Sequence, residues 1–321
     1  GGQEFNVTAS IGISVFPGEG ADLQTLLKNA DIAMYRAKEQ GKNNFQFYSA
    51  EMNQHTFERL ALETSLRRAI ERQEFLLHYQ PKTELRSGRI TGVEALVRWR
   101  HPELGMVSPA QFIPLAEETG LIGPIGDWVL RTACAEARRW ITQGASEISV
   151  AVNLSARQFA REDLAESITA VLSESGLEPR FLEIEITEST VMYDAKRAAR
   201  VLQQLKDMGI RVAIDDFGTG YSSLGYLKRF PIDSVKIDRS FILDIPHDND
   251  DVAITRAVIA MAHSLRLKVI AEGVETDEQY RFLLDHDCDE MQGYHFSKPV
   301  DAAAVARLLS QPRAKSKSRS A

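Results

Sequence analysis

Short apolar runs rich in β-branched residues recur along most of this chain, and the longer segments between them place apolar residues at helical spacing. From about residue 76 onward, eight of these runs predict strands. The predicted strands are residues 76–79, 92–98, 148–154, 182–186, 211–215, 234–238, 268–272 and 291–295. Strands that alternate with helices in this number predict an α/β fold with a (β/α)8 TIM-type barrel.

Residues with known preferences for helix ends mark several of the predicted helices. Ser108 and Pro109 are typical of an N-cap followed by the first helical turn. Glycines indicate where helices stop, because Gly readily adopts the left-handed conformation that commonly follows a helix. The glycines in question are Gly120, Gly144, Gly176 and Gly209.

The segment between the first two predicted strands is too short to contain a helix. It contains Arg86-Ser87-Gly88-Arg89-Ile90 and little else. A crossover between parallel strands needs about a dozen residues or more, whereas antiparallel strands can be joined by a short turn. We therefore predict that strands 1 and 2 form an antiparallel hairpin, so that the barrel has one antiparallel strand.

The first 50 residues follow a different pattern, which predicts a strand over 7–16, a helix over 22–40 and a strand over 44–48. Two strands and one helix cannot enclose a core alone. The predicted division of the chain is 1–50 for this segment, 51–73 for an amphipathic connecting helix, 74–312 for the barrel and 313–321 for a basic tail. We expect the tail to be disordered, with contact to an acidic partner as the alternative.

Composition places the chain among ordinary globular proteins, with 321 residues, 44% hydrophobic and 26% charged. The net charge of −7 argues against DNA or RNA as the main partner, but not against a small anionic substrate, because bound cations can invert the local field. Cys134 and Cys288 form no CxxC pattern, which fits a reducing, cytoplasmic location. No membrane segment or signal peptide is evident, and an upstream membrane anchor in the parent protein stays open.

Four predicted strands end in acidic or amide side chains: Glu94, Asn153, Glu185 and the pair Asp215-Asp216. A single carboxylate at a strand end is usually a cap or a solvated group. Side chains at the ends of successive barrel strands converge, however, and oxygen-rich clusters hold hard cations such as Mg²⁺ or Mn²⁺. The pattern therefore favours metal-assisted chemistry.

The two-residue period of a strand adds further candidates. Arg98 shares a face with Glu94, and an arginine beside a metal ligand suits a phosphate ester. Lys236 shares a face with Asp238, and a lysine inside a barrel is costly unless it is paired. It could orient or acidify a water molecule, or form a structural salt bridge with Asp238. Glu272 ends the seventh strand and can accept a proton from the same water.

The adjacent residues Asp215 and Asp216 would point to opposite faces of a regular strand. If the chain turns there, both can reach one site, and Asp215 could bridge two cations. Two cations roughly 3.5–4 Å apart clamp the oxygens of an in-line phosphoryl displacement. The glycine-containing loop over 216–223 follows directly, and Glu188 is placed to hold it through hydrogen bonds to its hydroxyl groups.

Seven ordered motifs resemble the EAL family of cyclic di-GMP phosphodiesterases, over about residues 58–312. The motifs are Glu94-Ala95-Leu96-Val97-Arg98, Asn153-Leu154-Ser155, Glu185-Ile186-Thr187-Glu188-Ser189, Asp215-Asp216-Phe217-Gly218-Thr219-Gly220, Lys236-Ile237-Asp238, Glu272-Gly273-Val274-Glu275 and Gln292-Gly293. The family fold is a (β/α)8 barrel with one antiparallel strand, which agrees with the predicted hairpin. The resemblance implies hydrolysis of cyclic di-GMP to linear pGpG by two-metal activation of water.

The resemblance also implies a role for each matching residue, and none of these positions departs from the family pattern. Ligands of two Mg²⁺ or Mn²⁺ ions are Glu94, Asn153, Glu185, Asp215 and Asp216, with Asp215 shared between the ions. Catalytic positions are Lys236 and Glu272, which position or deprotonate the attacking water, and Glu188, which steadies the loop. Substrate-binding positions are Arg98, Gln80, Asp238, Glu275 and Gln292.

The first 50 residues resemble the closing part of a GGDEF (diguanylate cyclase) domain. The motifs that carry this resemblance are Ser10-Ile11-Gly12-Ile13-Ser14, Asn29 through Lys38, and Gly41-Lys42-Asn43. Gly1-Gly2-Gln3-Glu4-Phe5 is not the cyclase signature, because only four residues separate it from the Ser10 motif and the family places several dozen there. We therefore expect a truncated remnant without cyclase activity.

Two other functions remain as alternatives. A non-catalytic cyclic di-GMP receptor would bind the nucleotide without turnover, and an unrelated Mg²⁺-dependent barrel lyase would share only the general carboxylate pattern. The resemblance also makes a homodimer through the barrel near residues 216–223 a plausible assembly.

Overall fold

The computed structural model describes residues 8–41, 43–145, 148–220 and 224–310. The chain divides into two compact units, Gly1–Arg68 and Ala69–Ala321. The boundary lies inside the segment 51–73, for which the sequence predicts a connecting helix, and helix α2 (Glu51–Ala69) occupies most of that segment. The stretch Gly1 to Phe5, part of the loop over 216–223 and the predicted tail lie outside the described residues.

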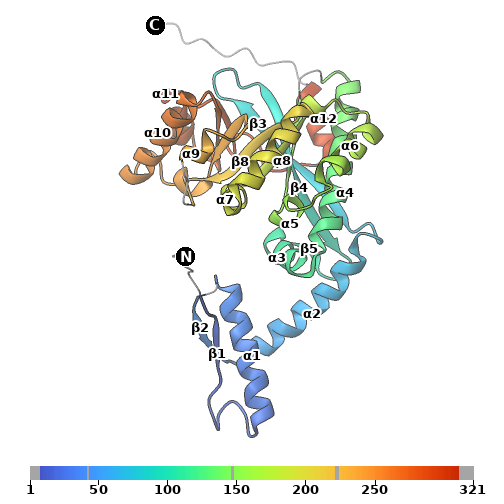
Figure 1. Cartoon of the computed structure of the whole chain (residues 1–321), viewed down its shortest axis with the longest axis vertical. Helices are drawn as coiled ribbons and strands as arrows, with labels where there is room; N and C mark the ends of the chain where they lie inside the picture. Colours follow the sequence, from blue (N-terminus) through green and yellow to red (C-terminus); the bar gives the residue numbers. More distant parts are fainter. Residues whose placement is uncertain (1–7, 42, 146–147, 221–223, 311–321) are drawn as a thin grey trace. The chain divides into compact units, whose positions relative to one another are not determined.

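Eight strands of the second unit close into a barrel, as the sequence predicts (Figure 1). Around the barrel the order is β3-β11-β10-β9-β8-β7-β6-β4, and β4 pairs again with β3. The strands are β3 (Phe75–Glu84), β4 (Ile90–His101), β6 (Ser149–Asn153), β7 (Leu182–Thr187), β8 (Arg211–Phe217), β9 (Ser234–Ile237), β10 (Lys268–Glu272) and β11 (Glu290–Gln292).

The predicted hairpin is also present. Strand β3 runs antiparallel to β4, with Gln80 opposite Glu94, and antiparallel to β11. The other barrel pairs are parallel. A short strand β5 (Gly105–Val107), which the sequence pattern does not predict, pairs antiparallel with the end of β4. The predicted eighth strand extends too far along the chain, because β11 ends at Gln292 where Gly293 meets the backbone of Val274.

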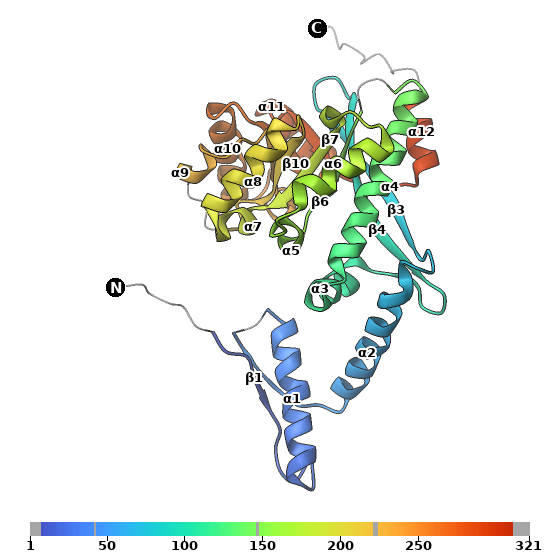
Figure 2. The ribbon, with the colours of Figure 1, turned by 45° about the vertical axis from the view of Figure 1, so that its right-hand side comes forward.

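Helices surround the barrel, as Figures 1 and 2 show. Among the main ones, α4 packs on β6, α8 on β8, α10 on β9 and β10, and α12 on β3. The helices are α3 (Pro109–Thr119), α4 (Ile122–Thr142), α5 (Ala156–Phe159), α6 (Leu164–Ser175), α7 (Glu188–Tyr193), α8 (Ala195–Asp207), α9 (Leu224–Leu227), α10 (Asn249–Ser264), α11 (Asp277–Asp285) and α12 (Ala302–Ser310), with 3₁₀ turns η1 (Pro179–Phe181) and η2 (Arg239–Phe241). The predicted caps are present, since Ser108 forms a capping box before Pro109 and all four predicted glycines follow helix ends with positive φ.

Side chains alternate along each strand between the helix-facing core and the interior of the barrel. Apolar residues such as Val152, Ile184 and Ile214 are completely buried. Their neighbours in sequence have the opposite parity and project into the barrel, which leaves that interior to polar groups such as Glu185. Within the described part of the chain, no helix has the length and apolar character needed to cross a membrane.

The first unit consists of β1 (Ile11–Ile13), α1 (Leu23–Glu39), β2 (Phe45–Phe47) and most of α2. The two strands are parallel, and α1 connects them. Gly12 lets α1 approach, because a Cβ atom there would lie 1.9 Å from the carbonyl oxygen of Ala30. Ile11, Phe45 and Phe47 remain more than half exposed, which agrees with the expectation that so few elements cannot enclose a core.

Candidate active site

A buried lysine gathers acidic side chains from several barrel strands. The prediction that a strand ends at Glu94 is wrong, because β4 continues to His101 through its pairing with β3 and β5. Lys236 on β9 is completely buried, and its Nζ atom lies within salt-bridge distance of four carboxylates. The distances are 2.7 Å to Glu272, 2.8 Å to Glu185, 3.1 Å to Asp215 and 3.7 Å to Glu94. These residues come from four different strands, because parallel strands bring their carboxyl ends to one end of the barrel.

Amide side chains extend the cluster on the side of the hairpin. Asn153 donates a hydrogen bond of 2.6 Å to Glu94 Oε1, and Gln292 donates to the other oxygen of Glu94. Gln292 also donates to Gln80 Oε1 at 3.1 Å. Gln80 lies opposite Glu94 in the pairing of β3 with β4. This pairing places Gln80 beside the amide and carboxylate side chains of Gln292 and Glu94.

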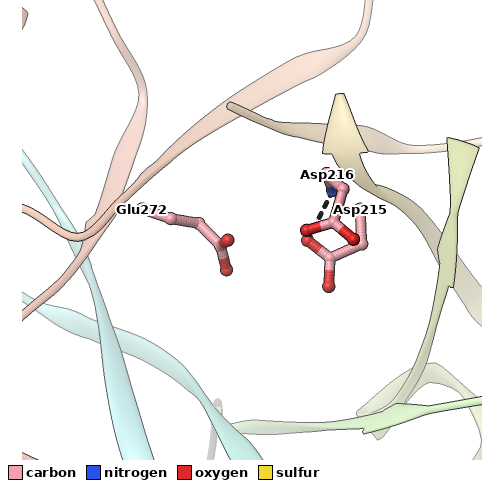
Figure 3. Close-up of side chains that lie close together, drawn as sticks. All are labelled: Asp215, Asp216 and Glu272. Atoms are coloured by element: carbon pink, nitrogen blue, oxygen red, sulfur yellow. Dashed lines mark hydrogen bonds between the residues drawn. The ribbon is translucent and has the colours of Figure 1, made fainter. Parts of the chain in front are cut away.

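Asp215, Asp216 and Glu272 form a group of carboxylates that could hold a metal ion. One oxygen from each lies within 4.8 Å of the others, and Figure 3 shows the Glu272 carboxylate pointing toward the two aspartates. The predicted turn is present, since Asp216 has a φ of 53° and the strand register shifts between Ile214 and Phe217. This irregularity lets adjacent aspartates face one site, and the Asp216 amide donates to Asp215 Oδ1 at 2.9 Å.

Glu188 contacts the loop after β8 through the backbone. Its side chain is buried, and Oε2 accepts a 2.9 Å hydrogen bond from the amide of Gly218. Gly220 passes close by, because a Cβ atom there would lie 3.0 Å from Glu188 Oε1. The sequence predicts contact with hydroxyl groups, but the Thr219 hydroxyl donates instead to the Asp216 carbonyl, and residues 221–223 lie outside the described residues.

Three predicted substrate contacts form their hydrogen bonds or ion pairs with residues outside the acidic cluster, although the charges of Arg98 and Glu94 act on each other, as do those of Asp238 and Asp216. Arg98 is half-buried and donates to the carbonyl oxygen of Val97. Asp238 accepts hydrogen bonds from the amide and hydroxyl of Ser240, so the alternative of a salt bridge between Lys236 and Asp238 is wrong within the described residues. Glu275 forms an exposed ion pair of 2.8 Å with Arg239.

The pKa values of the acidic groups shift in opposite directions, because burial raises them and the two buried lysines lower them. Burial raises the pKa of Glu94, Asp215 and Asp216 above their usual range and raises the pKa of Glu272 to about 8, although Lys236 opposes each of these shifts. Burial also acts to raise the pKa of Glu185, but Lys236 and Lys82 outweigh it and lower that pKa. Glu185 is therefore the carboxylate that stays ionised, whereas Glu94, Asp215 and Glu272 bind protons more readily.

Sequence reasoning missed one charged residue of this region. Lys82 on β3 is buried and ion-pairs with Glu183 and with Glu185, the latter at 3.1 Å. It has the same parity as Gln80, so the argument that selects Lys236 applies to it as well. Glu183 shares the parity of Glu185 and has no role assigned from the sequence; the structure gives it Lys82 as a partner.

The donor set fits a hard divalent cation. Carboxylate and amide oxygens are the preferred ligands of Mg²⁺ and Mn²⁺, and histidine and cysteine do not join the acidic group that the structure brings together among its described residues. A barrel with such a cluster at the carboxyl ends of its strands defines a class of metal-dependent enzyme folds.

Comparison with known families agrees with this class. Residues 63–299 match the family model described as "EAL domain", and the chain therefore belongs to the EAL family. Residues 1–44 match the model described as "Diguanylate cyclase, GGDEF domain". The two matches follow the order that the sequence motifs predict.

Similar proteins carry phosphodiesterase names. The chain is 49% identical over 300 residues to the "Bifunctional diguanylate cyclase/cyclic di-GMP phosphodiesterase MucR" of Pseudomonas aeruginosa, which covers 94% of this chain and 44% of that protein. It is 42% identical over 304 residues to "Cyclic di-GMP phosphodiesterase PdeR" of Escherichia coli, covering 95% and 46%. The solved structure "PaMucR Phosphodiesterase, c-di-GMP complex" matches 76% of this chain and 99% of its own, with 49% identity and a TM-score of 0.75. The chain thus spans less than half the length of these two curated relatives.

Proposed function

We propose that this chain is a metal-dependent phosphodiesterase that hydrolyses one phosphodiester bond of cyclic di-GMP and releases linear pGpG. The observation that carries the proposal is the convergence of Glu94, Glu185, Asp215 and Glu272 on Lys236, with Asp216 beside them. The names of the relatives and the solved complex support the choice of cyclic di-GMP as the substrate.

The charge of the cluster supports two cations. Five carboxylates and one ammonium group leave four formal negative charges when all are ionised, which two divalent cations would neutralise. We assign the first Mg²⁺ or Mn²⁺ ion to Glu94, Asn153, Glu185 and Asp215, and the second to Asp215 and Asp216. When bound, the two cations would polarise the scissile phosphate and lower the pKa of the attacking water.

The residues of the chain have complementary tasks in this proposal. Glu272 accepts the proton of the attacking water, for which its pKa of about 8 suits a general base near neutral pH. Lys236 fixes that carboxylate at 2.7 Å and orients the water. Glu188 holds the Gly218 amide and steadies the loop beside Asp216.

Substrate contacts lie around this centre. Arg98 binds a phosphate oxygen, because it stands on the same strand and face as Glu94. The remaining assigned contacts are Gln80, Asp238, Glu275 and Gln292, of which Gln80 and Gln292 are joined by a hydrogen bond.

The proposal extends to the first unit and to assembly. We assign no cyclase activity to the short GGDEF match, because it covers only residues 1–44. Incubation with GTP should therefore give no cyclic di-GMP. A homodimer through the barrel near residues 216–223 rests on the family resemblance, and sedimentation of the purified chain tests it.

Purified protein incubated with cyclic di-GMP tests the main proposal. With Mg²⁺ or Mn²⁺, chromatography should show pGpG, and a chelator should abolish its formation. Glu94→Gln should lower the rate by at least about 10- to 100-fold, since even residues that only support metal ligands have effects of that size. Glu174→Gln serves as the control, because Glu174 pairs with Arg131 on the surface.

Two outcomes would contradict the proposal. Product that forms at the same rate in chelator would exclude the assigned metal dependence. Tight nucleotide binding without product, in every metal tried, would support the receptor alternative instead.

A further inference from the structure

Lys82 crosses the inside of the barrel beneath the acidic cluster. Its backbone belongs to β3, and its ammonium group reaches Glu183 on β7, which is not a neighbouring strand. Both side chains are buried, with exposed fractions of 2% for Lys82 and 8% for Glu183. The stem of Lys82 passes beside Gly92, where an added Cβ atom would lie 3.5 Å from Lys82 Cε.

The position of Lys82 matters because of what it does to Glu185. Oε1 of Glu185 is 3.1 Å from Lys82 Nζ, and Oε2 is 2.8 Å from Lys236 Nζ. Glu185 is completely inaccessible to solvent, so these two ammonium groups, rather than water, fix the plane of its carboxylate. A buried carboxylate oxygen that loses its donor is left with an uncompensated desolvation cost and tends to reorient.

Glu183 accounts for the charge of Lys82. The proposed metal cluster, with Lys236, already has the formal charge that two divalent cations would neutralise. A lone extra lysine would leave one excess positive charge beside Glu185 and oppose cation binding. Glu183 cancels it, so the pair can supply a hydrogen bond to Glu185 at no net change in charge.

We propose, on the basis of the proposed function, that Lys82 is a positioning residue for the metal site. Its ammonium group holds Oε1 of Glu185, so that the carboxylate presents Oε2 to Lys236 and to the acidic cluster, while Glu183 neutralises the lysine. The opposing interpretation is that Lys82 and Glu183 form a structural pair that only fills the barrel.

A double variant separates the two interpretations. Lys82→Met/Glu183→Met keeps similar side-chain lengths, removes no net charge and leaves neither partner as an isolated buried ion. Metal binding is measured without substrate, by titrating Mn²⁺ and following its electron paramagnetic resonance signal. Turnover of cyclic di-GMP is then measured at saturating Mn²⁺.

The positioning role predicts a folded double variant with weaker metal binding. We expect Mn²⁺ affinity to fall about 10- to 100-fold, the range found when a group that orients a metal ligand is removed. The kcat should fall with it, while KM changes less than about 3-fold, because Lys82 lies beneath the cluster and not at the substrate. If this variant does not fold, Lys82→Leu/Glu183→Val provides the same test with a smaller pair.

Lys268 and Glu290 provide the matched control. They form a 3.1 Å ion pair, and Glu290 precedes Gln292 on β11 by two positions, as Glu183 precedes Glu185 on β7. Lys268→Met/Glu290→Met should leave Mn²⁺ affinity unchanged.

Three results would overturn the role of Lys82. The first is a folded double variant whose Mn²⁺ affinity and kcat equal those of the parent chain. The second is an equal loss in the control variant, which would indicate general loosening of the barrel. The third is a parent chain that neither binds Mn²⁺ nor hydrolyses cyclic di-GMP, which would overturn the proposed function and the role of Lys82 with it.

Discussion

Replacing Lys236 by methionine should destabilise the metal-free protein strongly and in a pH-dependent way. The substitution keeps the length of the side chain and removes the ammonium group that four carboxylates share. The carboxylates of Glu94, Asp215 and Glu272 would then face one another without a cation, and Glu185 would keep only Lys82 as a partner.

The magnitude follows from the distances and from the burial of the site. At an effective dielectric constant of about 20, an ion pair at the observed 2.7 to 3.7 Å is worth roughly 4 to 6 kcal/mol before desolvation. The net cost is smaller, because the abandoned carboxylates take up protons, and removal of one partner of a buried pair usually costs about 3–5 kcal/mol. We expect a loss of that size at pH 8, equivalent to a melting temperature lower by roughly 6 to 20 °C.

The pH dependence has a definite sign. Without Lys236 the folded-state pKa values of Glu94, Asp215 and Glu272 rise further above their unfolded values, so the folded variant binds more protons than the unfolded chain. Its stability is then greatest at low pH and declines as pH rises through those folded-state pKa values. The penalty of Lys236→Met should therefore be smaller at pH 5 than at pH 8.

Urea unfolding of chelator-treated protein at both pH values measures this effect. Arg131→Met is the control, because Arg131 pairs with Glu174 and both side chains are more than half exposed, and such pairs contribute less than about 1 kcal/mol. A Lys236→Met variant that unfolds within about 1 kcal/mol of the parent chain at pH 8, or whose penalty is the same at pH 5, would refute the electrostatic reasoning.

Two further predictions concern the cations and the loop after β8. Because the pKa of Glu272 is raised to about 8, cation binding must displace protons, and Mg²⁺ affinity should increase between pH 6 and pH 8. Calorimetry in buffers of different ionisation enthalpy would detect the released protons. A pH-independent affinity would contradict this prediction. Gly218→Ala should lower the free energy of unfolding by at least about 1 kcal/mol more than Gly144→Ala does. Both glycines have φ near 100°, but only at Gly218 would the new Cβ atom lie 2.9 Å from the Phe241 ring. Equal unfolding free energies of the two variants would show that the ring moves away freely.

The barrel is predictable because its strands follow a simple pattern. Runs of buried β-branched residues, separated by helices with clear caps, fix the number and order of the strands, and the short segment over 86–90 fixes the hairpin. Strand ends are harder to predict. Strand β11 stops at Gln292, because the next residue meets the backbone of Val274, a contact that no local pattern reveals.

The candidate site also has a part that the sequence predicts and a part that it does not. Parity along a strand is enough to place Glu94 and Lys236 inside the barrel. The same parity applies to Lys82, yet its significance depends on Glu183, a residue 101 positions away on a strand that does not adjoin β3. Glu188 also accepts a hydrogen bond from the amide of Gly218, and the sequence does not predict this contact because a loop amide that turns toward a carboxylate leaves no mark in the side-chain sequence.

The sequence by itself determined the order of the elements, the face of each strand that is polar, and the kinds of side chain that end the strands. These properties follow from local periodicity and chemical identity. Tertiary structure alone decided which carboxylate meets which ammonium group, how the bulge at Asp216 turns adjacent aspartates toward one site, and that Lys82 reaches across the barrel to Glu185. Those contacts depend on the closure and register of the whole barrel, because distances between strands far apart in the chain are set by all the pairings between them.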